Sequence, residues 1–185
     1  MKVYLILADG FEEIEAITII DLLRRGNVEI ESVTITTNLE VTGAHGISIK
    51  SDIYMSDADF KNCCMIILPG GMPGTINLDN CEELNNQILK LKEKGAYICA
   101  ICAAPMILAD KGILKGKKAT IYPNMEKGLK ETANWVDDSV VKDGNIITSQ
   151  GPGTAMEFAL KLVEILRGKK EKEKVRNEIL FLSEN

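Results

Sequence analysis

Cys102 has the sequence surroundings of a nucleophile. It lies in the segment AICAA (residues 100–104), where a short apolar run gives way to a helical pattern that begins at Pro105. Small residues on both sides of a nucleophile are typical of a nucleophile elbow, because larger side chains would collide in its sharp strand-to-helix turn. There the thiol would face a helix N-terminus, which favours the thiolate and predicts a lowered pKa. The alternative is a buried cysteine that packs as a small apolar residue.

Glu15 is the second candidate. Ile19 and Leu22 follow it at four and seven positions, so helical spacing turns Glu15 toward the core. Burial of a carboxyl group raises its pKa and favours the protonated form, which can donate a hydrogen bond to a thiolate or an oxidised sulfur. The alternative is that Glu15, like Glu12 and Glu13 in the same turn, simply complements the helix dipole.

Two glycine-rich segments accompany these residues. The first, PGGMPG (residues 69–74), fits neither a dinucleotide-binding fingerprint nor a phosphate-binding loop. Its Gly70 and Gly71 amides can form an oxyanion hole beside the sulfur, and the alternative is a tight turn without function. The second segment, residues 150–154, contains Gly151 and Pro152. We expect it to lead into the last long helix and to line the pocket.

Residue counts limit the other mechanisms. His45 is the only histidine, so any mechanism that pairs a nucleophile with histidine must use it. Its glycine-flanked segment predicts an exposed position. Cys99 and Cys102 form a lone CxxC pair, which is a weak zinc signal, so we predict no metal site and no cofactor. We expect Cys99 to pack in the core. An odd count of five cysteines without a secretory leader argues against a disulfide framework.

Composition bounds the class of protein. The 185 residues carry a net charge of −5, with 45% hydrophobic and 26% charged residues. These values are ordinary for one globular domain, which we place at residues 1–185. The absence of a basic surplus argues against nucleic acid as a partner. No apolar run is long enough for a membrane span, so we expect a cytoplasmic protein.

Hydrophobic patterning predicts strands that alternate with helices, and hence an α/β fold with a mostly parallel sheet and helices on both faces. At Ser32 and Val33 the alternation changes phase, which suggests a bulge. Capping boxes are expected at Asn80 with Glu83 and at Thr154 with Glu157. The tail, residues 168–185, is either a docked helix or a frayed end. The expected strands are residues 3–7, 28–36, 65–68 and 97–101, the hairpins 41–49 and 140–148, and the helices 12–25, 80–94, 105–110 and 155–167.

In such a fold the working loops lie beyond the carboxyl ends of the strands. The unusual segments do follow predicted strands: residues 9–15, 70–74, 102–105 and 149–154.

Taken together, these segments resemble the ThiJ/PfpI superfamily, and most closely its parkinsonism-associated protein deglycase branch (the DJ-one-like proteins). The matching motifs, in order, are LADGFEEIE (residues 7–15), LPGG (68–71), AICAAP (100–105) and TSQGPGT (148–154). The resemblance implies a flavodoxin-like three-layer sandwich, commonly a homodimer. It makes Cys102 the reactive cysteine, Glu15 a protonated hydrogen-bond donor to it, and Gly70, Gly71 and Ala103 the source of backbone amides beside the sulfur.

Two departures from the family pattern matter. Peptidase-type members carry histidine directly after the cysteine, and Ala103 stands there, so the peptidase dyad is absent. Many closer relatives carry a histidine in the segment that matches residues 120–123, where this chain has Tyr122. A tyrosine is a poor general base at neutral pH. His45 could contribute across a dimer interface.

The resemblance implies two functions. The first is a cofactor-independent glyoxalase or deglycase that acts on small aldehydes or glycated proteins in stress protection. The second is a sensor or chaperone whose Cys102 oxidises to the sulfinate.

Overall fold

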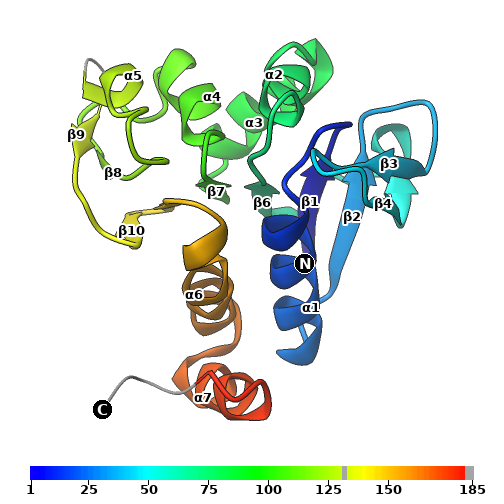
Figure 1. Cartoon of the computed structure of the whole chain (residues 1–185), viewed down its shortest axis with the longest axis vertical. Helices are drawn as coiled ribbons and strands as arrows, with labels where there is room; N and C mark the ends of the chain where they lie inside the picture. Colours follow the sequence, from blue (N-terminus) through cyan, green and yellow to red (C-terminus); the bar gives the residue numbers. More distant parts are fainter. Residues whose placement is uncertain (131–132, 182–185) are drawn as a thin grey trace.

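A seven-stranded sheet forms the centre of the molecule (Figure 1). The computed structural model describes residues 1–130 and 133–181. The strands of this sheet are β1 (Lys2–Leu7), β2 (Ile30–Thr34), β5 (Ile53–Tyr54), β6 (Cys63–Leu68), β7 (Tyr97–Ile101), β10 (Val140–Asp143) and β11 (Ile146–Ser149). Two small pairs lie outside it, β3 (Glu40–Thr42) with β4 (Ser48–Lys50) and β8 (Lys118–Ala119) with β9 (Asn134–Trp135). The helices are α1 (Glu13–Arg25), α2 (Gly74–Asp79), α3 (Glu82–Glu93), α4 (Pro105–Asp110), α5 (Lys127–Lys130), α6 (Ala155–Arg167) and α7 (Lys169–Glu178), with 3-10 turns at Met55–Asp57 and Pro152–Thr154.

The strand order is β10-β11-β7-β6-β1-β2-β5, and only the β10–β11 pairing is antiparallel. Its central part, β11-β7-β6-β1-β2, has the flavodoxin-like order of a doubly wound sheet, as the family resemblance implies. From β1 the chain moves first to β2 on one side and later to β6 on the other. In such sheets ligands bind beyond the carboxyl ends of the strands at this switch point.

Helices cover both faces of the sheet, which confirms the predicted three-layer arrangement (Figure 1). The side chains of β1 alternate between the two cores: Leu5 packs in the core under α1 and α6, and Ile6 in the core under α2, α3 and α4. This alternation explains why the strand is apolar at every position, because each of its faces is buried.

The strand predicted at residues 28–36 has no bulge. The register of β2 with β1 is regular from Ile30 to Thr34, so the prediction at Ser32 and Val33 is wrong. The Ser32 hydroxyl instead donates to Asp52 at 2.8 Å. A hydrogen-bonded serine can be buried in the strand, so the change of phase needs no extra residue.

Both predicted capping boxes are absent. Cys81, not Asn80, is the N-cap of α3, and it makes no side-chain cap hydrogen bond, because Asn80 still belongs to the end of α2. Thr154 is the N-cap of α6, but its hydroxyl bonds with the Ser149 hydroxyl at 2.7 Å instead of capping the helix. Local side-chain hydrogen bonds thus compete with the helix cap.

The C-terminal segment is a docked helix rather than a frayed end over the described residues. Val175 of α7 is fully buried, and Ile179 and Phe181 pack against the core under α1 and α6. The part of the predicted tail at residues 182–185 lies outside the described residues.

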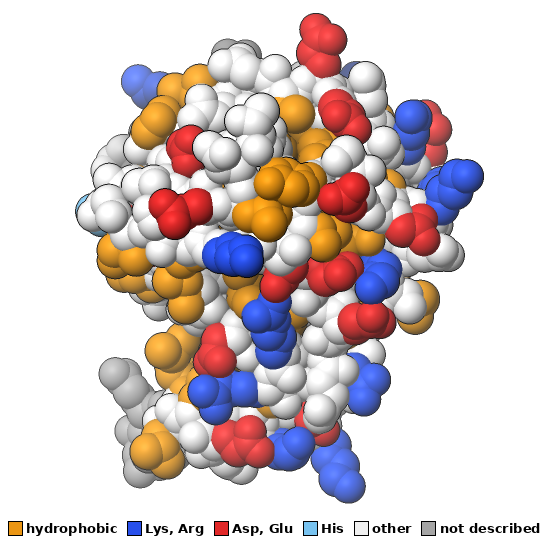
Figure 2. Space-filling view, turned by 90° about the vertical axis from the view of Figure 1, so that its right-hand side faces the viewer, with side chains coloured by type: hydrophobic (Ala, Val, Ile, Leu, Met, Phe, Trp, Pro, Cys, Tyr) orange, Lys and Arg blue, Asp and Glu red, His pale blue; other side chains and the backbone are white. Residues whose placement is uncertain are grey.

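Acidic and basic side chains are interspersed on the face shown in Figure 2, which presents no continuous basic surface among the described residues. Over those residues, no helix has the length and apolar character needed to cross a membrane.

Candidate active site

Cys102 occupies a sharp turn between β7 and α4. Its φ angle is +63°, in the left-handed region that non-glycine residues rarely adopt. The Cys102 N–H donates to the Ser149 carbonyl of the neighbouring strand at 3.0 Å, which fixes the turn to the sheet. The structure therefore contains the elbow that the small neighbours of Cys102 predict, and backbone strain of this kind is concentrated at functional sites.

Gly70 allows the loop after β6 to approach this turn. A Cβ atom on Gly70 would lie 2.5 Å from Cys102 Cβ and 2.9 Å from its sulfur, so no other residue fits without a shift of the backbone. Gly71 has a φ angle of +93°, which also favours glycine. The two glycines thus bring backbone amides to the sulfur and to Glu15.

The backbone amides near Cys102 do not all donate to its sulfur, as the prediction had them do. The N–H groups of Gly71 and Ala103 donate to the Cys102 sulfur and lower the pKa of that thiol. The Gly70 N–H instead donates to Glu15 Oε2 at 2.7 Å. Gly70 is therefore not one of the amides beside the sulfur, because its donor already holds the carboxyl group.

Glu15 points inward, as its helical spacing predicts. Its side chain is fully buried next to Gly70 and Cys102. Burial raises the pKa of Glu15 to about 7, although the Gly70 amide and the Cys102 thiol oppose that shift. Its Oε1 atom has no hydrogen-bond partner among the described residues. An unpartnered buried oxygen makes the charged form costly, so the site favours the protonated acid.

The predicted lowering of the Cys102 pKa is wrong. Burial, followed by the charge and the hydrogen bond of Glu15, raises the pKa of Cys102 to about 12. The α4 dipole does not compensate, because α4 has only six residues and the sulfur lies beneath the loop after β6. When Glu15 is protonated, its charge is gone and its hydroxyl can donate to the sulfur, so neither effect of Glu15 raises the pKa of Cys102 any longer. The ionisation of the two groups is therefore coupled, and one negative charge on the pair disfavours a second.

The sulfur opens into a pocket of about 480 Å³. Three of the predicted pocket residues line it, namely Tyr122, His45 and Pro152, whereas Gly151 lies behind the Tyr122 ring. The remaining lining residues are Glu12, Ile14, Gly71, Met72, Cys102, Ala103 and Met125. The prediction missed Glu12, Ile14, Met72 and Met125. Only Glu12 had a signal, since it belongs to the same acidic turn as Glu15.

Tyr122 is held next to the elbow by a backbone hydrogen bond. Its backbone N–H donates to the Cys102 carbonyl at 3.0 Å, so the segment after β8 follows the turn. The Tyr122 side chain is 46% exposed at the pocket mouth. A Cβ atom on Gly151 would lie 3.1 Å from its ring, which shows how closely that loop supports it.

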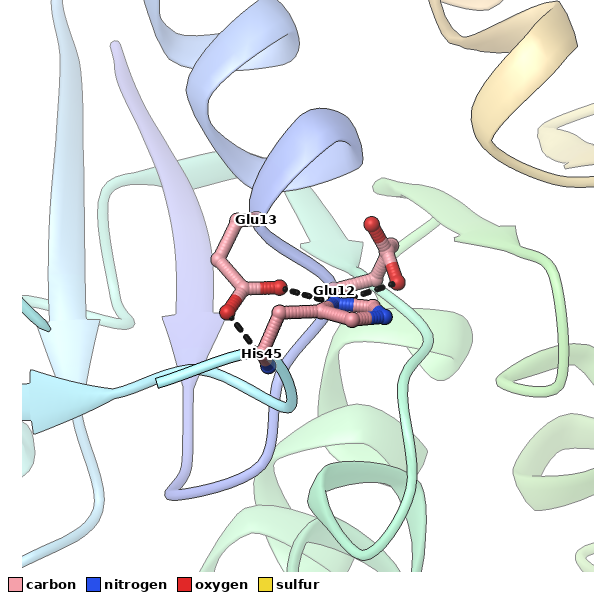
Figure 3. A group of neighbouring side chains, drawn as sticks. All are labelled: Glu12, Glu13 and His45. Carbon is pink, nitrogen blue, oxygen red and sulfur yellow. Dashed lines mark hydrogen bonds and ion pairs between the residues drawn. The ribbon is translucent and has the colours of Figure 1, made fainter. Parts of the chain in front are cut away.

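Glu12, Glu13 and His45 form a cluster at the rim (Figure 3). His45 Nδ1 lies 2.8 Å from Glu13 Oε2 and 3.7 Å from Glu12 Oε2. The hydrogen bond to Glu13, followed by the charges of both carboxylates, raises the pKa of His45. Burial alone would raise the pKa of Glu13, but hydrogen bonds from His45 and from backbone amides hold it below its ordinary value.

The three ligand atoms of this cluster lie within 4.8 Å of one another, close enough to surround a metal ion. However, both Glu13 oxygens are already engaged with His45. These contacts satisfy the cluster by themselves, so we assign no metal site. His45 also lines the pocket of its own chain, so it needs no dimer interface to lie at the pocket that contains Cys102.

The other cysteines have different surroundings. Cys99 is fully buried, as predicted, and burial raises its pKa well above the ordinary value. Burial likewise raises the pKa of Cys63 to about 12. All five cysteines are unpaired, and among them only Cys102 lines the pocket described above.

Comparisons with known proteins all indicate the same family. Residues 1–165 match the DJ-1/PfpI family. The chain is 41% identical over 181 residues to Protein DJ-1 homolog A of Arabidopsis thaliana, covering 97% of this chain and 46% of that protein. It is 38% identical over 157 residues to the glutathione-independent glyoxalase DJR-1.2 of Caenorhabditis elegans, covering 85% of this chain and 83% of that protein. Deglycase TK1284 of Thermococcus kodakarensis is 31% identical over 169 residues, covering 90% of this chain and 100% of that protein.

The fold agrees with this result. The crystal structure of Drosophila melanogaster DJ-1beta has a TM-score of 0.93 and 37% identity, and the match covers 97% of each chain. The chain spans about half the length or less of the two Arabidopsis relatives, 46% of one and 39% of the other. Sequence match, fold and motif order agree, and the chain belongs to the DJ-1/PfpI family.

Proposed function

We propose that the protein is a cofactor-independent enzyme that converts small reactive aldehydes through a covalent adduct on Cys102. The observation that carries this proposal is the elbow itself: a thiol at a φ angle of +63°, next to the fully buried Glu15, that opens into a pocket. Relatives named glyoxalase and deglycase support the general kind of chemistry.

The first step is addition of the thiol to an aldehyde such as methylglyoxal. The Cys102 sulfur bonds to the aldehyde carbon, and the thiol proton ends on the former carbonyl oxygen. Glu15 can relay that proton, because its pKa of about 7 allows both protonation states near neutral pH. The amides of Gly71 and Ala103 stabilise the negative charge that forms on the sulfur. The product is a hemithioacetal.

Lactate then forms without an external oxidant. The hydrogen on the carbon that bears sulfur moves to the neighbouring carbon, and the hydroxyl proton moves to the neighbouring oxygen. The result is a lactoyl thioester, which water cleaves to lactate and free Cys102. From a glycated amine, the Cys102 sulfur would bond to the carbinolamine carbon as the carbon–nitrogen bond breaks. The amine would leave with the thiol proton, and the same hemithioacetal would result.

The test is lactate formation from methylglyoxal by the purified chain. We expect turnover in the wild type and in the control Cys81→Ser, whose cysteine lies outside the pocket, and none in Cys102→Ser. Tyr122→His restores the histidine common in this segment and is expected to raise turnover if the tyrosine limits the rate. Equal turnover in wild type and Cys102→Ser would sink the proposal.

The second candidate is a redox sensor in which Cys102 oxidises to the sulfinate. Its specific support is the Gly71 and Ala103 amides, which can donate to sulfinate oxygens, next to a protonated Glu15. A chaperone role would accompany that state. After mild peroxide, intact-mass and peptide spectrometry should locate two added oxygens on Cys102. Oxidation confined to other cysteines would count against this candidate.

We also propose that residues 1–185 form one domain, that the protein acts in the cytoplasm, and that it assembles as a homodimer. Ile14 and Ile17 are three residues apart on α1, and both are exposed, as is Ile47 on the β3–β4 hairpin. Apolar residues at one surface favour a second copy as the partner. Sedimentation of wild type and Ile17→Lys tests this, since the variant should sediment as a monomer.

A further inference from the structure

The β3–β4 hairpin wraps around the carboxylate of Glu13. The backbone N–H of His45 donates to Glu13 Oε1 at 2.7 Å, and that of Ile47 lies at 3.5 Å from the same atom. Gly43 lies directly against this carboxylate, where a Cβ atom would overlap it. The Glu13 carboxylate therefore holds the tip of the hairpin through backbone hydrogen bonds. These bonds fix the position of the His45 backbone at the pocket rim.

The same carboxylate also orients the His45 ring. Its other oxygen, Oε2, lies 2.8 Å from Nδ1. The Glu13 side chain is only 4% exposed, whereas that of His45 is 69% exposed. Figure 3 shows the second ring nitrogen on the side away from Glu13. A carboxylate on Nδ1 holds the proton there and leaves the lone pair on Nε2, as in a catalytic triad.

We infer that Glu13 and His45 form a proton-transfer dyad for the Cys102 pocket, in which His45 Nε2 moves the substrate proton and Glu13 positions the ring. Both His45 and Cys102 line this pocket. The inference rests on the proposed function, because it supplies the base for the hydrogen transfer in the hemithioacetal.

The step balances within the adduct. His45 Nε2 takes the proton from the carbon that bears sulfur, and that electron pair forms a carbon–carbon double bond, leaving an enediolate. The imidazolium then returns the proton to the neighbouring carbon. The hydroxyl proton passes to the neighbouring oxygen, and the lactoyl thioester results. One carbon is oxidised and its neighbour is reduced by the same amount.

His45 suits this task better than Tyr122. A tyrosine hydroxyl is a weak base, whereas a neutral imidazole is the commonest general base in enzymes. Among the described residues, the titratable groups around His45 are Glu13 of α1 and Glu12 at its N-cap, with Cys102 and Tyr122 lining the same pocket. Both carboxylates raise the pKa of His45. The neutral imidazole that can act as a base therefore forms at a higher pH than it would for an ordinary histidine.

The first test is His45→Ala with chemical rescue, measured as lactate formation. We expect kcat to fall roughly 10²- to 10⁴-fold and free imidazole to restore part of it, since the exposed ring leaves an open site. The control Ser48→Ala, at an exposed position of β4, should keep wild-type turnover. Methylglyoxal with deuterium on its aldehyde carbon should show a larger isotope effect in His45→Ala.

The second test addresses Glu13 as a positioning residue. Glu13→Gln replaces the carboxylate with an amide of the same size, which would donate to Nδ1 and reverse the tautomer. We expect kcat to fall and the acidic limb of the pH profile to move to lower pH. We expect no further loss when Glu13→Gln is added to His45→Ala. A lower melting temperature with an unchanged kcat and pH profile would overturn the positioning role.

The outcomes separate the two proposals. Wild-type turnover that survives Cys102→Ser overturns the proposed function and, with it, the dyad. Turnover that needs Cys102 but is unchanged in His45→Ala overturns only the dyad. Turnover that is lost with a chelator and recovered with Zn²⁺ also overturns only the dyad, because the cluster would then hold a metal.

Discussion

Glu13 and Glu15 are two residues apart on α1, and their surroundings give them opposite acidities. Glu13 receives hydrogen bonds from His45, which hold its pKa below the ordinary value despite burial. Glu15 receives one amide hydrogen bond, from Gly70, and has one unpartnered oxygen, so burial raises its pKa to about 7. The number of donors that reach a buried carboxyl group decides whether it is a fixed charge or a proton carrier.

The difference matters for chemistry because the two acids serve different partners. Glu15 lies beside the Cys102 sulfur, where the proposed addition to an aldehyde moves a proton. Glu13 lies behind His45, where a permanent negative charge orients a ring. Four measurements on three variants would break or sharpen this contrast.

The largest effect is expected for Glu15→Gln on turnover. An amide keeps the shape and can still accept from Gly70 N–H, but it cannot relay a proton. We expect lactate formation to fall roughly 10²- to 10⁴-fold. Glu83→Gln is the matched control, since Glu83 is an exposed acid in the first turn of α3. Wild-type turnover in Glu15→Gln would show that Glu15 carries no proton.

The same variant should change how stability depends on pH. The pKa of Glu15 rises from an ordinary 4.5 to about 7 on folding, so the folded state keeps a proton that the unfolded chain has released. The wild type therefore loses free energy of unfolding as the pH rises through this range. At pH 8, Glu15→Gln should be more stable than wild type by on the order of 3 kcal/mol. Urea titrations from pH 5 to 8 measure this, and parallel curves would contradict it.

Glu13→Gln should act on stability in the opposite sense. It weakens hydrogen bonds to a buried carboxylate, which we expect to cost about 1–3 kcal/mol. The pKa of Glu13 is lowered, so its contribution is present above pH 4.5 and fades as the pH falls through the lowered value. The pKa of His45 is raised, so its contribution is present below pH 6.5 and fades as the pH rises through the raised value. The loss of free energy of unfolding in Glu13→Gln should be largest at a pH between the lowered pKa of Glu13 and the raised pKa of His45. A uniform loss across the pH range would argue against the ion pair.

The smallest effect concerns substrate choice. Glu12 lines the otherwise mostly apolar pocket, and its carboxylate should repel an anionic aldehyde. A repulsion of roughly 1 kcal/mol corresponds to about a fivefold preference. Glu12→Gln should therefore raise kcat/KM for an anionic 2-oxoaldehyde, 4,5-dioxopentanoate, relative to methylglyoxal by about that factor. An unchanged ratio would place the substrate away from this side chain.

Much of the fold could be predicted because strong periodicity survives in the sequence. The fully apolar run at residues 3–7 indicates a strand buried on both faces, and α6 is recovered with its observed bounds. The helix α2 was missed because Gly74, Thr75 and Asn77 are poor helix formers, and tertiary contacts of the loop stabilise it. The capping boxes failed because spacing alone does not show which hydrogen bonds a neighbouring strand offers first.

The site was recovered in part for a similar reason. Helical spacing places Glu15 inward and the small neighbours identify Cys102, since both signals are local. The Gly70 donor and the raised Cys102 pKa depend on how loops from separate strands meet, which no local pattern encodes. The pairing of Glu13 with His45 joins residues that are 32 positions apart, so it required the hairpin geometry.

The tight approach of Gly70 to Cys102 has an evolutionary consequence. With 2.5 Å between a Cβ atom there and the Cys102 Cβ, position 70 is closed to mutation, and the inner wall of the pocket can change little. Exposed rim positions such as Met72 and Tyr122 carry no such steric constraint. New reactions on this fold should therefore arise by substitutions at the rim of the pocket, while the residues of its inner wall stay the same.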